Sequence, residues 1–354
     1  ASKYGEAVLA IKYRVRAKDG SMIGGPMYAL ERGLKQKWLG ILFALFAGFA
    51  CFGIGNGTQG NSITGMVNDT FGVSPYITGA ILTILTGVVI IGGVKSIAKV
   101  CEKLVPFMAG FYIIGCIIIL ILNHAYVLDA LKLIVSSAFT PKAAGGGFIG
   151  STVMMAIRFG IARGLFTNEA GLGSAPIVDA AASTRNPVRQ GLIAMTGVFW
   201  DTVIVCALTG LVLVSSILRN PDGMSGLSGG ALSSAAFANI PVVGPIVLTV
   251  GLICFAWSTI LGWSYYGERC WVYLCGQKAI MPFRIIYTLV VFVGSVMTLD
   301  AVWGIADILN ASMAFPNLVA LLGLSGVIAS ETKKYLFDDN MDGWSDDEIP
   351  VVDK

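Results

Sequence analysis

The chain contains 354 residues, of which 55% are hydrophobic and only 13% are charged. Because soluble domains average about 25% charged residues, this composition excludes a soluble protein and predicts one that resides in a lipid bilayer. The formal net charge of +3 says little by itself, because in a membrane protein the positions of the basic residues carry the information.

Apolar stretches without charged residues predict the membrane-spanning helices, since crossing a bilayer takes about 20 such residues. Regular spans are predicted at residues 38–68, 70–94 and 104–123. Further spans are predicted at residues 148–182, 190–218, 240–267 and 285–298, with a last region at 299–334. The fourth and the last are irregular, and residues 125–139 have the spacing of an interfacial helix. The fold class is therefore predicted to be all-α, a polytopic helical bundle in the membrane.

The last apolar region is expected to cross the membrane only once. Two full crossings would place Lys333 and Lys334 on the side opposite the other basic loops. We therefore interpret Asp300–Phe315 as a half-helix or kinked entry, Pro316 as the break, and Asn317 as the start of the following helix.

The basic residues predict the orientation of the chain. Eight Lys and Arg residues precede the first complete span, and cytoplasmic loops carry such an excess. The N-terminal segment and the acidic tail at residues 338–354 are thus expected in the cytoplasm. The tail nearly matches a calcium loop, but Ile349 stands where the bidentate glutamate is required. A solvated tail is expected instead.

One stretch at membrane depth contains residues that a continuous lipid-facing helix would lack. Arg158–Pro176, RFGIARGLFTNEAGLGSAP, combines several glycines with two arginines and a glutamate. An unwound helix exposes N–H groups that suit a carboxylate and carbonyl groups that suit an ammonium group or Na⁺. The stretch is predicted to bind a zwitterion. The alternative is a glycine kink that Arg–Glu pairing stabilises for packing alone.

Two motifs, GGPMYALERGL at Gly24–Leu34 and RGLFTNEAGLGSAP at Arg163–Pro176, resemble the alanine or glycine:cation symporter family. The resemblance covers nearly the whole chain. It implies a leucine-transporter-like fold, in which two inverted five-helix repeats each begin with a broken helix. It further implies a transmembrane symporter domain at residues 1–337, which begins at the end of the second core helix and lacks the helices before it.

Substrate contacts are expected in the broken segment and in the first complete span. Phe166-Thr167 followed by Gly171 and Gly173 also resembles the unwound sixth core helix of neurotransmitter:sodium symporters. That resemblance implies that Phe166 and Thr167 line the substrate site, and backbone at Gly171 is expected to approach the ligand. Gln59, within GIGNGTQGNS, is a further candidate. Its alternative role is a hydrogen bond between packed helices.

Ser258, Thr259 and Trp263 form the remaining candidate group, within about one helical turn of one another. The superfamily resemblance implies that the adjacent hydroxyls bind a sodium ion and that Trp263 walls the substrate pocket. Without it, both hydroxyls would be expected to bond to carbonyls of their own helix.

Together these features predict a secondary symporter with alternating access in the plasma membrane. It would carry a small neutral amino acid, alanine or glycine, into the cell with Na⁺, or with H⁺ as the alternative ion. A channel-like or scaffold membrane protein without coupled transport is the second hypothesis. An enzyme is not expected, because a single histidine provides too few ligands or bases. Neither a cofactor beyond the coupling ion nor a nucleic-acid partner is expected.

Overall fold

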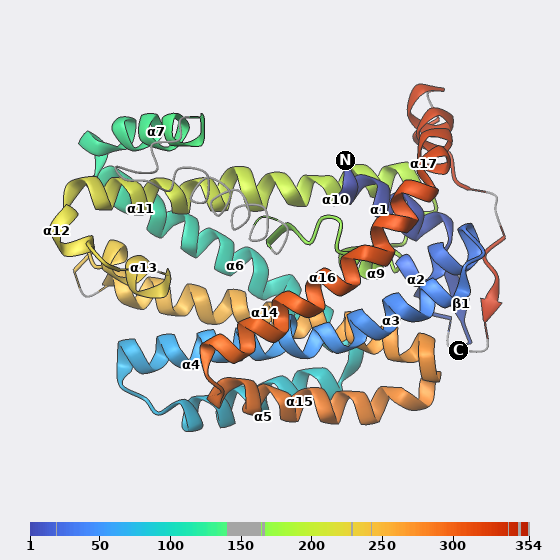
Figure 1. Ribbon diagram of the computed structural model, residues 1–354, viewed down its shortest axis with the longest axis horizontal. Helices are drawn as coiled ribbons and strands as arrows, with labels where there is room; N and C mark the ends of the chain where they lie inside the picture. Colours follow the sequence, from blue (N-terminus) through green and yellow to red (C-terminus); the bar gives the residue numbers. More distant parts are fainter. Residues whose placement is uncertain are drawn as a thin grey trace, which may run out of the picture.

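The computed structural model in Figure 1 describes residues 1–18, 20–139, 164, 167–227, 229–241, 243–338, 340–345 and 348–352. Within these ranges, six helical runs are long and apolar enough to cross a membrane. They comprise Lys37–Phe71, Gly93–Leu122, Pro187–Arg219, Val243–Cys275, Gln277–Val296 and Ala306–Gly323. The predicted multi-pass helical membrane protein is confirmed.

The chain begins with short elements that precede the first span. They are α1 (Ser2–Lys12), β1 (Val15–Ala17), β2 (Met22–Ile23), α2 (Pro26–Tyr28) and the π-helix η1 (Ala29–Gly33). Gly20 has a φ of +82° in the turn between the two strands, a conformation that glycine adopts readily.

The first span is continuous but not uniformly α-helical. It consists of α3 (Lys37–Phe52), the π-helix η2 (Gly53–Gly57) and α4 (Thr58–Phe71). Glycine is required at position 55, because a Cβ there would lie 2.1 Å from the Cβ of Trp263. The glycines thus allow a neighbouring helix to approach the wide turn, and π-bulges of this kind often occur at functional sites.

The next helices present apolar side chains to the lipid. They are α5 (Pro75–Ile91), α6 (Gly93–Leu122) and α7 (His124–Phe139). On α5, Ile84 and Val88 are 66% and 71% exposed, which a bilayer permits and water would penalise. The helix predicted at residues 125–139 is present as α7, which stands apart near one end of the molecule (Figure 1), and its interfacial position stays a prediction.

The fourth predicted span lies mostly outside the described residues. Its described end is irregular, as expected, and leads into α9 (Ala175–Asp179). The following span contains α10 (Pro187–Val198), the π-helix η3 (Phe199–Cys206) and α11 (Ala207–Arg219). The short helices α12 (Pro221–Met224) and α13 (Gly229–Phe237) then connect to the next span.

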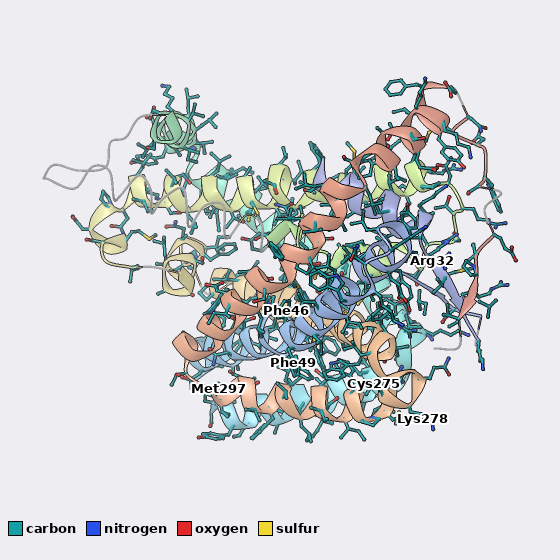
Figure 2. All side chains as sticks on the ribbon, turned by 45° about the vertical axis from the view of Figure 1, so that its right-hand side comes forward. Arg32, Phe46, Phe49, Cys275, Lys278 and Met297 are labelled. Carbon is teal, nitrogen blue, oxygen red and sulfur yellow. The ribbon has the colours of Figure 1, made fainter. Side chains whose placement is uncertain are left out.

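The centre of the bundle is α14 (Val243–Cys275), which packs against α3, α4 and α6. After the 3₁₀ turn η4 (Gln277–Ala279), α15 (Ile280–Val296) lies beside α5. Figure 2 shows Lys278 and Met297 near opposite ends of α15, with Arg32 and Cys275 toward the Lys278 end.

The predicted break at Pro316 is wrong. Residues Leu299–Gly323 form one helix, α16, with Pro316 inside it. Proline removes a single backbone donor, and the helix is held by its packing against α3 and η2. The chain continues through α17 (Ser325–Thr332) and the π-helix η5 (Lys333–Phe337).

The described part of the tail is docked, so the expected solvated tail is also wrong. Strand β3 (Val351–Val352) pairs in parallel with β1, which pairs antiparallel with β2. Asn186 donates to the carbonyl oxygens of Met341 and Gly343 at 2.9 and 3.0 Å. These bonds place the tail on the same side as the N-terminal strands, at the right of Figure 1.

Candidate functional site

The chain is not helical at residues 169–174, immediately before α9. Gly171 and Gly173 have φ angles of +89° and +84°, and Glu169 has a φ of +52°. Glycine adopts such angles readily, but glutamate does so at an energetic cost. The predicted interruption is therefore present. The strained backbone of Glu169 points to a functional role for the segment, because such strain is typical of functional sites.

The N–H groups of this interruption bind a carboxylate of the protein itself. Both oxygens of Glu6 accept from the N–H of Gly171, at 3.1 and 3.2 Å, and Oε1 also accepts from Gly173 at 3.0 Å. Nδ2 of Asn317 donates to Glu6 Oε1 at 2.6 Å and to the carbonyl oxygen of Gly171 at 2.9 Å. The N–H groups that were expected to receive a substrate carboxylate thus have a partner.

The two glycines are required for different reasons. A Cβ at Gly173 would lie 2.7 Å from Phe43 and 2.8 Å from Pro26, so no side chain fits. At Gly171 the nearest atom to a Cβ would be Leu318 Cδ2 at 3.9 Å. Space is open at Gly171, and its positive φ is what favours glycine.

Trp263 on α14 connects the interruption with the π-helix of the first span. Its side chain is 2% exposed, and its ring meets Tyr266 edge to face at 5.4 Å between centroids. Glu169 accepts a hydrogen bond from Ser174 at 2.9 Å, and the side chains of Trp263 and Tyr266 also bond to its carboxylate. Since Trp263 also contacts Gly55, segments far apart in the sequence meet at this indole.

Gln59 lies about one turn beyond Gly55 and is half-buried. Its Nε2 donates to the carbonyl oxygen of Ile54 at 3.1 Å and approaches Thr58 Oγ1 at 3.4 Å. The side-chain amide thus donates within its own span, and Oε1 is the acceptor atom that it could offer to a ligand. Its role in substrate binding stays a prediction.

The hydroxyls of Ser258 and Thr259 both donate to the carbonyl oxygen of Phe255 at 2.9 Å. This is the bonding expected of ordinary helix residues. Each hydroxyl oxygen keeps lone pairs that a cation could bind, and the role of both residues in ion binding stays a prediction.

Comparison with known proteins places the chain in a family. A family model described as the sodium:alanine symporter family matches residues 1–347. The chain belongs to this family. The sodium/alanine symporter AgcS of Methanococcus maripaludis is 51% identical over 95% of this chain and 74% of its own length. An uncharacterized transporter of Haemophilus influenzae is 51% identical over 99% of this chain and 76% of its own length.

Phe166 and Thr167, two of the predicted substrate contacts, lie just before the interruption in the sequence. Phe166 lies outside the described residues. Thr167 is exposed in the short helical turn before the interruption. Next to it, Lys3 Nζ donates to the carbonyl oxygen of Asn168 at 3.1 Å, so a cation from α1 lies close to this segment.

Sequence reasoning missed Glu6, Asn317 and Tyr287. Glu6 is a lone carboxylate in an apolar helix, a signal that could have identified a buried charge. Asn317 was considered only as a helix start. The Tyr287 hydroxyl donates to the carbonyl oxygens of Gly55 and Ile260, at 3.1 and 3.0 Å. It links the π-helix to the residue after Thr259, and no local pattern indicates this.

Proposed function

We propose that the protein is a secondary symporter that carries alanine across the plasma membrane together with Na⁺. Glycine is proposed as a second substrate and H⁺ as the alternative coupling ion. The observation that carries the proposal is the interruption at residues 169–174, where a strained Glu169 and Trp263 of a spanning helix meet. Buried charge within a membrane bundle usually marks function.

The packing around the interruption supports an alternating-access carrier more than a channel. The cavity between Glu6, Gly25, Pro26 and Asn317 measures about 10 Å³, no more than one water molecule needs. A channel would require a continuous aqueous path, whereas a carrier passes through closed states. The name of the relative AgcS pairs sodium with alanine, and we extend that pairing to this chain.

We assign the substrate-contacting roles to Gln59, Phe166, Thr167, Gly171 and Trp263, and the Na⁺-binding roles to Ser258 and Thr259. Two observations support this assignment: Trp263 packs against Gly55, and Gln59 lies about one turn beyond Gly55 in the same span. Gly171 contributes the shape of the backbone, since Glu6 and Asn317 occupy its N–H and carbonyl groups. The acidic tail is proposed to face the cytoplasm.

The test is uptake of labelled alanine by the natural protein in proteoliposomes. An inward Na⁺ gradient should drive saturable uptake that unlabelled glycine inhibits, and an H⁺ gradient alone should drive little. Uptake driven equally by H⁺ would assign the coupling to protons. Uptake that does not saturate would indicate a channel, and the absence of uptake, with folded protein in the membrane, would favour a scaffold.

A further inference from the structure

Glu6 is a buried carboxylate, and among the described residues its hydrogen-bond donors belong to the interruption and to α16. It is 2% exposed and accepts from Gly171, Gly173 and Asn317 at distances between 2.6 and 3.2 Å. Burying an ionised carboxylate is costly unless it is well bonded. Backbone donors, an amide and the charge of Lys3 oppose that cost only in part, because burial raises the pKa of Glu6 to about 7.

The same bonds determine the shape of the interruption. If Glu6 were removed, the N–H groups of Gly171 and Gly173 would lose their partner in a buried setting, and each unsatisfied donor is destabilising. Positive φ angles at both glycines turn the two N–H groups toward one carboxylate. Glu6 therefore acts on the conformation of residues 171–173, two residues from Glu169 and its contact with Trp263.

We propose that Glu6 is the positioning residue of the substrate site. Its carboxyl oxygens accept hydrogen bonds from the interruption and hold it in shape, so that Glu169 and Trp263 stay in the geometry that binds alanine. The substrate carboxylate is then bound by groups other than the N–H groups of Gly171 and Gly173. The expected effect on alanine transport rests on the proposed function. The expected effect on the conformation of residues 169–174 does not.

The first experiment compares Glu6→Gln and Glu6→Asp in alanine uptake. Gln keeps the size of the side chain but presents an NH₂ group toward backbone donors, so the KM for alanine should rise about 10-fold or more, as expected when bonds to a charged group are lost. Asp keeps the charge on a shorter side chain and should have a KM between those of Glu6→Gln and the wild type. The Na⁺ requirement at saturating alanine should stay unchanged.

Glu331→Gln is the matched control. Glu331 is 6% exposed and pairs with Lys12 of α1 at 2.7 Å, so it is a buried carboxylate of α17 that contacts α1 away from the interruption. Its substitution is expected to lower stability and to leave the KM for alanine unchanged. An equal rise in KM for Glu331→Gln would show that general loosening of α1, rather than positioning, explains the effect, and would overturn the proposal.

Hydrogen exchange tests the positioning without reference to transport. In Glu6→Gln, amides of residues 169–175 should exchange at least about 10-fold faster, because local opening there becomes easier, while α14 and α15 exchange as in the wild type. Unchanged exchange in this segment would overturn the inference even if the wild type transports alanine. If wild-type uptake failed but exchange rose as expected, the proposed function would be wrong and the positioning role would stand. Should Glu6→Gln not fold, Glu6→Asp provides the same comparison.

Discussion

Trp263 shows how one side chain can depend on residues distant in the sequence. Its contact with Gly55 leaves no room for a Cβ at position 55, and its contact with Glu169 comes from the interruption. Tyr266 supports the ring edge to face. The indole is therefore held by α14, the first span and the interruption together. Such a rigid position is what a side chain needs if it is to form a pocket wall that selects substrates by size.

Replacing Trp263 with alanine should admit larger amino acids. The vacated volume would accommodate a branched side chain, and leucine should then inhibit labelled alanine uptake at a concentration about 10-fold lower than in the wild type, a difference of roughly 1.4 kcal/mol. Competition assays measure this directly. Trp271→Ala is the control, since Trp271 lies on the same helix but bonds to Gly48. If leucine and alanine compete as in the wild type, Trp263 does not wall the pocket.

At the scale of elements, hydropathy predicts where helices cross but not how they deviate from regularity. The spans at 38–68, 190–218 and 285–298 correspond to helical runs of the structure, because each needs only a long apolar stretch. The π-helices η2 and η3 and the uninterrupted α16 were not predicted. Their geometry depends on neighbours, such as Trp263 against Gly55, and tertiary packing of this kind overrides the local signal of Pro316.

The helix α14 carries the proposed ion site, and a double substitution tests it. Ser258→Ala with Thr259→Ala should raise the Na⁺ concentration for half-maximal uptake about 10-fold or more, because a hard cation needs oxygen ligands to replace its hydration shell. Alanine affinity at saturating Na⁺ should change far less, since it responds only through linkage. A Na⁺ titration of uptake measures both.

Thr249→Ala supplies the control for that experiment. The Thr249 hydroxyl lies on the same helix and bonds to the carbonyl oxygen of Pro245 and to Thr70 Oγ1, both at 2.8 Å, so its substitution removes a helix hydroxyl outside the proposed site. Wild-type Na⁺ dependence in the double variant would show that Ser258 and Thr259 only bond to their helix.

At the scale of the whole molecule, the contacts that join sequence-distant segments were the least predictable. The broken segment and the importance of Gly171 followed from local composition. Its partners Glu6 and Asn317 did not, because they lie 165 and 146 residues away from Gly171. The docked tail was missed for the same reason, since an acidic composition predicts solvation when no partner surface is known.

Asn186 allows the docking of the tail to be tested separately from helix capping. Its Oδ1 accepts from the N–H of Arg189 at the start of α10, while its Nδ2 donates to the tail. Asn186→Asp keeps the cap and loses the two donors, each worth about 1 kcal/mol. Because a loss of about 2 kcal/mol corresponds to a factor of roughly 30, cleavage at Glu348 by a glutamate-specific protease should become roughly 30-fold faster.

Asp342→Ala is the comparison for the tail experiment, because the exposed contact between Asp342 and Arg189 at 3.9 Å should contribute little. Cleavage that is equally slow in Asn186→Asp and the wild type would show that the tail is held by other contacts.

The sheet at this end of the molecule also has a consequence for biosynthesis. Strand β1 pairs with β2 within the first residues of the chain, whereas β3 comes from the opposite end. At about 5–20 residues per second, the ribosome completes β3 roughly 20 s to 1 min after β1. During that interval the second edge of β1 is open, and open strand edges can pair with other chains. A nascent chain that has not yet reached β3 would therefore expose an edge of β1 that β3 covers later.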